Sequence, residues 1–243
     1  MSSGIPDMGC NNLTWQQIVD AVGMRPLLFQ PGNGYCYSNP GFMVIGEIIQ
    51  QLTQIPCSDF MKTNVFNPLG MKDTIIHTPD NTPSNLATGY AFDSNTMNWF
   101  TPDPRPPLSS FNAGAIISTA VDLSTFLAAL QQQLLLNSST YDLMWSVINP
   151  VAPWGLGWEV FITDQYQIYQ KDGGLPGFST QISIYHGDKV AVAIASNENS
   201  EQYVDLAADI VAAVLNLPSV PNPSAPVSSC GVACPASTPS VLK

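Results

Sequence analysis

Charged residues are scarce in this sequence, and positive charge is the scarcest of all. Asp, Glu, Lys and Arg make up 10% of the 243 residues, well below the roughly one quarter that is usual in soluble domains. Seven Lys and Arg stand against 18 Asp and Glu, so the formal net charge is −11. Phosphate polyanions repel such a chain, which argues against nucleic acid and against an anionic membrane surface as partners.

Long apolar runs are also missing. No stretch reaches the roughly 20 apolar residues that cross a bilayer, and residues 1–7 have neither the basic nor the apolar region of a secretion signal. Two features still point outward, because lysine is scarce and two sequons occur, Asn12-Leu13-Thr14 and Asn137-Ser138-Ser139. We therefore expect an extracellular or secreted protein that does not bind membranes and whose signal peptide is not within this sequence.

Cysteine and histidine occur without the spacing of a metal site. The cysteine count is odd, which leaves one thiol unpaired or shared with another chain. Only two histidines are present, and no zinc-binding pattern joins them to the cysteines. The composition favours one or two disulfides in an oxidising compartment, and we expect no metal and no cofactor. These residues are Cys10, Cys36, Cys57, Cys230, Cys234, His77 and His186.

Helical patterns dominate the first half of the chain. A capping box at residues 14–17 predicts a short helix that ends near Val22. A second capping box at residues 119–122 predicts another. Residues 76–112 are rich in Pro, Asn, Asp and Thr and predict a long irregular stretch. Residues 41–54 predict an amphipathic helix, because apolar side chains recur at helical spacing: Phe42, Ile45, Ile48, Ile49 and Leu52.

Beyond Pro153 the apolar period changes from 3.6 to 2. Alternating residues predict three antiparallel strands, near 158–162, 182–184 and 190–194, before a closing helix with an apolar stripe from Tyr203 to Val214. The order of helices, strand meander and final helix indicates an α+β fold. We predict one domain over residues 1–217 and a Pro/Ser-rich flexible tail over residues 218–243.

Six short motifs follow one another along the chain. They lie at residues 35–49 (YCYSNPGFMVIGEII), 66–74 (FNPLGMKDT), 87–90 (ATGY), 112–123 (NAGAIISTAVDL), 154–158 (WGLGW) and 171–178 (KDGGLPGF). In this order they resemble segments of the β-lactamase and penicillin-binding-protein family of serine hydrolases, which includes class C β-lactamases and esterases. The resemblance implies a β-lactamase/transpeptidase-like fold and hydrolysis of an ester or amide bond.

The chemistry of this family explains the residue types. A serine hydroxyl attacks a carbonyl and forms an acyl-enzyme, and it needs a base. Tyrosine, with an ordinary pKa of about 10, is a poor base unless ammonium groups beside it favour the phenolate. The resemblance implies that Tyr37 is the base and that Lys171 is the second of two lysine cations. It also implies that Asn39 orients the substrate amide and the first lysine.

The third family motif corresponds to Lys171-Asp172-Gly173. The resemblance implies that the backbone N–H of Gly174 forms half of an oxyanion hole. The middle position of the motif is usually a small hydroxyl residue, whereas this chain has Asp172. Its carboxylate would partly neutralise Lys171 and repel an anionic substrate. We therefore expect a neutral small-molecule or peptide ester or amide as substrate.

The family's nucleophile is not found where it is expected. The serine lies in a Ser-x-x-Lys motif upstream of the Tyr motif, and the 36 residues before Tyr37 contain no lysine. Residues 1–7 resemble the family's His-x-Ser-Gly-Leu-Pro segment, which lies between the two motifs. The match Ser240-Val241-Leu242-Lys243 falls in the Pro-rich tail. We expect the N-terminal part of the domain, with its serine, to lie outside this sequence.

Three hypotheses for function follow. The first is part of a serine hydrolase that is incomplete and inactive as this chain. The second is a pseudoenzyme that kept the fold and acts as a binding or scaffold protein. The third is a disulfide-stapled extracellular binding module unrelated to the family. His77 and His186 match no family motif and are interpreted as ordinary surface or loop residues. The substrate, cysteine pairing and oligomeric state are not fixed by the sequence.

Overall fold

The computed structural model describes residue 20 and residues 23–24, 26–78, 81–103, 112–148, 152–198 and 203–223. The short helix expected over residues 14–22 lies outside the described residues except for Asp20. Cys10, Cys230 and Cys234 also lie outside them, and no disulfide joins the two described cysteines, Cys36 and Cys57, to each other.

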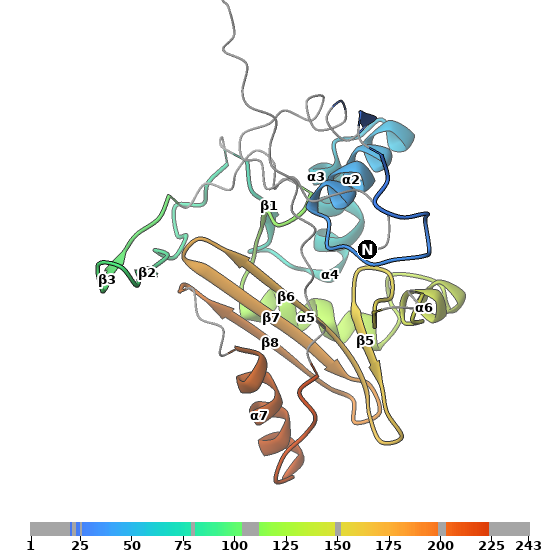
Figure 1. Ribbon diagram of the computed structural model, residues 1–243, viewed down its shortest axis with the longest axis vertical. Helices are drawn as coiled ribbons and strands as arrows, with labels where there is room; N and C mark the ends of the chain where they lie inside the picture. The colour runs from blue at the N-terminus through green and yellow to red at the C-terminus, as the bar shows by residue number, and fades with distance from the viewer. Residues whose placement is uncertain are drawn as a thin grey trace, which may run out of the picture.

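A four-stranded antiparallel sheet forms the centre of the fold (Figure 1). Its strands are β5 (Glu159–Ile162), β6 (Gln167–Leu175), β7 (Phe178–Tyr185) and β8 (Val190–Ser196), in that order across the sheet. Three were predicted and the fourth, β6, was missed. Ile168, Tyr169 and Gln170 are all buried in β6, and polar residues and glycines follow them, so the strand has no apolar alternation to detect.

Helices cover both faces of the sheet. On one face Ile168, Tyr185 and Val192 pack against α7 (Tyr203–Leu215), which confirms the predicted closing helix. On the other face Tyr169 and Ile184 pack with side chains of α5 (Ala120–Gln131) and α6 (Ser138–Met144). Because successive strand residues point to opposite faces, neighbours such as Tyr185 and Ile184 serve different cores. The predicted helix after Thr119 corresponds to α5, and α6 was not predicted.

Residues 39–69 are mostly helical and lie beside the sheet (Figure 1). They contain α2 (Asn39–Thr53), α3 (Cys57–Met61), the π-helical turn η1 (Lys62–Phe66) and α4 (Asn67–Leu69). Two small antiparallel pairs complete the fold, β1 (Ile75–Ile76) with β4 (Ile116–Ile117), and β2 (Ala91–Asp93) with β3 (Asn98–Phe100). The stretch expected to be irregular over residues 76–112 therefore contains a β-hairpin.

Helix α2 was predicted, but not the side that it buries. The residues of α2 that are buried are Pro40, Met43 and Gly46, whereas Ile45, Ile48 and Leu52 of the predicted stripe are exposed. Gly46 decides the orientation, because a methyl group there would overlap the Asn112 side chain. Close approach of the Asn112 segment thus selects the small residue rather than the large ones.

The start of the predicted tail contacts the domain. Val220 is buried in the core beneath α7, and the carbonyl of Pro221 accepts a hydrogen bond from the Tyr185 hydroxyl at 2.9 Å. Gln170 Nε2 donates to the carbonyl of Pro223 at 2.6 Å. Residues 218–223 therefore pack on the sheet despite a composition typical of a tail. Residues 224–243 lie outside the described residues.

Asp122 joins two of the family-like motifs. Its carboxylate accepts hydrogen bonds from the backbone N–H of Asp73 at 2.9 Å and from the Thr74 hydroxyl at 2.7 Å. The Asp122 backbone N–H in turn donates to Thr119 Oγ1 at 3.2 Å, which caps α5. One buried carboxylate thus fastens the 66–74 segment to the first turn of α5.

Replacing Asp122 should destabilise the fold strongly. In Asp122→Ala the Asp73 N–H and the buried Thr74 hydroxyl lose a charged acceptor. A hydrogen bond to a charged group contributes about 1.5–3 kcal/mol, so we expect the free energy of unfolding to fall by about 2–4 kcal/mol. Urea unfolding followed by circular dichroism measures this. The control is Asp142→Ala on the exposed face of α6, which should change stability by less than about 0.5 kcal/mol. Equal effects of the two variants would contradict the assignment.

Candidate active site

Tyr37 and Lys171 come together from distant parts of the sequence. Tyr37 lies just before α2, whose N-cap Ser38 accepts a hydrogen bond from the Gly41 N–H at 3.1 Å. Lys171 lies in the middle of β6. Its Nζ is 5.5 Å from the centroid of the Tyr37 ring, within the range of a cation–π contact. The two residues predicted as base and cation are therefore neighbours.

The Lys171 ammonium has two further partners. It donates to the Asp172 carbonyl at 2.7 Å and forms an ion pair with Asp172 Oδ1 at 2.9 Å. It also lies 5.7 Å from the centroid of the Trp154 ring. The Asp172 side chain is 58% exposed, and an ion pair this exposed contributes at most about 1 kcal/mol. Lys171 is thus held loosely enough to exchange Asp172 for another partner.

Tyr35 is a second tyrosine at this place, but its environment differs. Its ring stacks on Trp154 with centroids 5.5 Å apart. Burial, followed by the negative charge of Glu159, raises the pKa of Tyr35 well above the ordinary tyrosine value. Tyr35 therefore stays protonated and is not a base. Its hydroxyl and Trp154 Nε1 are buried, and neither finds a hydrogen-bond partner among the described residues.

The remaining predicted site residues lie beside this pair. Asn39 is the first residue of α2 and is half-buried. Gly173 pairs with Thr180 of β7, and a Cβ at Gly173 would lie 2.9 Å from Thr180 Oγ1, so this position requires glycine. Gly174 is exposed and pairs with Ser179. The roles predicted for Asn39, Asp172, Gly173 and Gly174 stay predictions.

Trp154 was missed as a member of the site. It begins the WGLGW motif at residues 154–158, for which the sequence predicts no catalytic or binding role. The structure places its buried ring between Tyr35 and the Lys171 ammonium. A single tryptophan in a Gly-rich segment carries no signal of such a contact in the sequence.

The two residues that flank Tyr37 are buried, and the Cys36 thiol donates to the Tyr37 carbonyl at 3.6 Å. Ser38 is adjacent to Tyr37 but is fully buried, and its oxygen caps α2. The Ser-x-x-Lys match at residues 240–243 lies outside the described part of the chain. The site as described therefore presents the two residues predicted as base and cation, together with strand glycines.

The two histidines differ in their surroundings. His186 is exposed in the turn after β7, as interpreted. His77 lies in the loop after β1, one of the two places interpreted for it, but this loop position is buried rather than on the surface. Its backbone N–H donates to the Ala115 carbonyl at 2.7 Å, and its Nε2 lies 2.7 Å from Thr82 Oγ1. The β1–β4 pairing draws His77 inward, which the local sequence does not indicate.

The described ranges contain neither a metal-binding cluster nor a membrane-spanning helix. No group of three or more His, Cys, Asp or Glu side chains is placed there to hold a metal ion. None of the described helices has the length and hydropathy needed to cross a bilayer.

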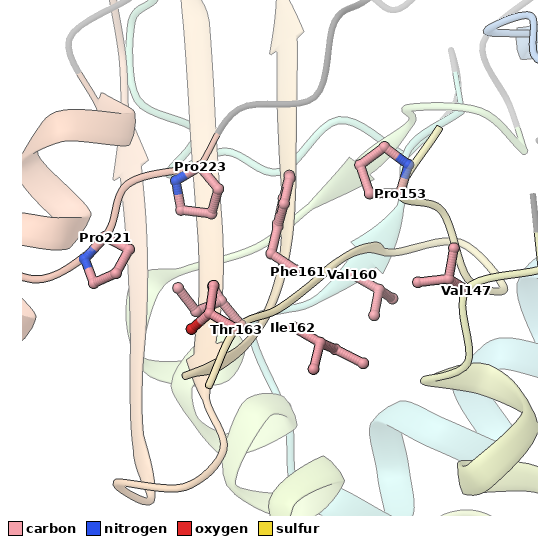
Figure 2. A pocket seen from close by; sticks show the side chains of 9 residues that line it. Val147, Pro153, Val160, Phe161, Ile162, Thr163, Pro221 and Pro223 are labelled. Carbon is pink, nitrogen blue, oxygen red and sulfur yellow. The ribbon is translucent and has the colours of Figure 1, made fainter. Parts of the chain in front are cut away.

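An apolar pocket of about 340 Å³ lies elsewhere on the sheet (Figure 2). None of the predicted site residues lines it, and Thr163 is the one polar side chain in its wall. Without a base, a cation or a nucleophile it cannot carry acyl transfer. The lining residues are Val147, Pro153, Val160, Phe161, Ile162, Thr163, Ile168, Pro221 and Pro223.

Comparison with known proteins decides the family. Residues 1–216 match the Beta-lactamase family. The chain belongs to this family. The predicted resemblance is therefore confirmed, and so is the α+β fold of the β-lactamase and transpeptidase type. The structure is similar to D-amino acid amidase from Ochrobactrum anthropi SV3, with a TM-score of 0.73 and 25% identity over 88% of this chain and 70% of that one. It is also similar in fold to an octameric penicillin-binding protein homologue from Pyrococcus abyssi, with a TM-score of 0.76.

Curated relatives are longer than this member of the family. Penicillin-binding protein 4* of Bacillus subtilis (strain 168) is 26% identical over an alignment of 226 residues. The alignment covers 82% of this chain and 50% of that protein. The unguisins hydrolase of Aspergillus campestris is 30% identical over 199 residues, 75% of this chain and 36% of that protein. The chain thus spans half or less of the length of these two relatives.

The burial of His77 predicts a pH-dependent stability. Burial lowers the pKa of the imidazole, so the unfolded chain binds a proton more readily than the folded one. The contribution of neutral, buried His77 to the free energy of unfolding is therefore fully present above the unfolded pKa of about 6.5. As the pH drops below that value, the free energy of unfolding falls by at most about 1.4 kcal/mol per pH unit.

Urea unfolding between about pH 7.5 and about pH 5.5 measures this dependence. We expect His77→Gln to lose part of the decline, because glutamine does not titrate. The matched control is His186→Gln at the exposed histidine, which should keep the decline of the parent. An unchanged pH dependence in His77→Gln would show that His77 takes up no extra proton on unfolding.

Proposed function

We propose that this β-lactamase family member carries the base and oxyanion half of an acyl-transfer site that hydrolyses esters or amides. The contact between the Lys171 ammonium and the Tyr37 ring is the observation that carries the proposal. It brings the residue proposed as cation to the residue proposed as general base, the pair that a transfer of the serine proton would use in this family. The family match and the order of the six motifs support the same chemistry.

In the proposed reaction Tyr37 takes the proton of a serine hydroxyl as the serine oxygen bonds to the substrate carbonyl carbon. The carbonyl oxygen becomes negative and accepts a hydrogen bond from the Gly174 N–H. The intermediate collapses to an acyl-enzyme, and the leaving alcohol or amine receives the proton from Tyr37. Water then repeats the sequence and releases the acid. Asn39 holds the substrate amide during these steps.

The 36 residues before Tyr37 contain no Ser-x-x-Lys motif, so we propose that residues 1–243 alone form no acyl-enzyme. Exposed apolar side chains support this part of the proposal. Ile45, Ile48 and Leu52 face outward on α2, directly after Tyr37. Apolar side chains gathered at this density usually contact another segment.

We further propose a substrate without negative charge. Asp172 is exposed beside Lys171, and the net charge of −11 adds a repulsive field. Relatives named for amide chemistry support this choice, among them the D-amino acid amidase of Ochrobactrum anthropi and a D-aminopeptidase of Gluconobacter oxydans.

The two sequons and the low lysine content support a secreted location.

Labelling with a fluorescent fluorophosphonate tests the proposed site. Residues 1–243 should not label, whereas a longer chain that carries a Ser-x-x-Lys segment of the family ahead of Met1 should. In the longer chain Tyr37→Phe and Lys171→Ala should slow labelling by about 10²–10⁴-fold, the usual contribution of a general base. The control is Lys189→Ala in the exposed β7–β8 turn, which should label normally. A folded longer chain that does not label would favour the pseudoenzyme hypothesis instead.

Matched acyl donors test the role of Asp172. The longer chain should hydrolyse p-nitrophenyl acetate faster than the anionic half ester p-nitrophenyl succinate. Asp172→Asn should raise the relative rate on the anionic ester about 3–10-fold, because one nearby charge is removed, and added salt should shrink the difference. Asp188→Asn, also exposed but in the β7–β8 turn, should change the ratio little. Faster hydrolysis of p-nitrophenyl succinate than of p-nitrophenyl acetate by the unsubstituted longer chain would contradict the proposal.

A further inference from the structure

The β2–β3 hairpin displays aromatic side chains that the proposed chemistry does not use. It projects beyond the end of the central sheet, away from α7 (Figure 1). Large apolar side chains of this hairpin and its base are 43–71% exposed, which is unusual for residues of this size. They are Tyr90, Phe92, Met97, Trp99 and Phe100.

The register divides these side chains between two faces. Phe92 and Trp99 are directly opposite each other, and their ring centroids are 5.3 Å apart. Tyr90 precedes Phe92 by two residues and therefore points to the same side. Ala91 and Phe100 pair on the other side. We call Tyr90, Phe92 and Trp99 the aromatic face of the hairpin.

The base of the hairpin rests on the strand end that carries the proposed oxyanion group. Gly89 lies against Phe178 and the Gly177 carbonyl, so closely that a Cβ would be 2.6 Å from the Phe178 ring. Pro102, at the other end of the hairpin, lies against Gly177 as well. Gly177 belongs to the β6–β7 turn, three residues after Gly174. The base of the hairpin therefore adjoins the turn that follows the strand end with Gly173 and Gly174.

Charge on the hairpin indicates what this surface accepts. Asp93 is the one charged residue among residues 89–102, and it lies on the side opposite to the aromatic face. Its carboxylate accepts hydrogen bonds from the Asn95 N–H and the Thr96 hydroxyl, both at 2.9 Å. The aromatic face thus offers ring surface without a charge, which suits an uncharged apolar group.

We propose that the aromatic face binds an aromatic group of the substrate whose ester or amide bond is placed at the end of β6. The inference rests on the proposed function and adds a substrate class to it: uncharged esters or amides with an aromatic ring. The hairpin holds the ring while Gly173 and Gly174 face the reacting carbonyl. Binding of the ring needs no nucleophile, so the chain as it exists can be tested.

Ligand NMR with two uncharged amides, N-acetylphenylalanine amide and N-acetylalanine amide, measures the preference. We expect the phenylalanine amide to bind residues 1–243 roughly 10-fold more tightly, the order of discrimination that apolar contacts give. Phe92→Ser with Trp99→Ser should abolish the preference, whereas Trp99→Phe should retain it. Phe100→Ser is the matched control, an exposed aromatic on the other side of the same hairpin, and should leave the preference unchanged.

Several outcomes would overturn the inference. These are a preference that survives in the double variant, an equal loss in Phe100→Ser, or no binding of either amide by the folded chain. Self-association that disappears in the hairpin variants would instead assign the face to a protein contact. The proposed function fails separately if Lys171→Ala leaves the labelling rate of the longer chain unchanged, whether or not residues 1–243 prefer the phenylalanine amide.

Discussion

The antiparallel pairing of β6 with β7 is the constraint on which the site depends. The first half of β6 is anchored from both sides, with Ile168 in the core beneath α7 and Tyr169 in the core beside α5. The second half carries Lys171 to Gly174 in continuous register with β7. Burial of one half of the strand therefore fixes the other half in place, although residues 171–174 contribute little to either core.

A second set of buried contacts brings Tyr37 to this strand. Gln170 of β6 donates to Glu159 of β5 at 3.0 Å, and Glu159 forms a β-bridge with Trp154. Trp154 stacks on Tyr35, two residues before Tyr37. These links run from the sheet to the segment before α2, so the distance between Tyr37 and Lys171 is set by packed neighbours rather than by the exposed Lys171–Asp172 pair.

The sequence predicted the parts that depend on local period or on motif order. The helices after Thr119 and at Tyr203 followed from their apolar spacing, and the neighbourhood of Tyr37 and Lys171 followed from the family motifs. Contacts between distant segments were not predictable. Asn112 turns α2 by packing on Gly46, and the sheet draws in residues 218–223 against composition. His77 is buried through its pairing with Ala115, which no local pattern encodes.

The scarcity of positive charge has consequences at three levels of the molecule. A surface with few charged groups, of which most are negative, disfavours anionic ligands at long range. Asp172 adds repulsion within the site itself, beside the lysine that would otherwise attract a carboxylate. The aromatic face of the hairpin, which carries no charge, then offers its favourable contacts to ring surface. In the proposed function, repulsion of anions and attraction of rings would select the same kind of ligand, and specificity commonly combines both.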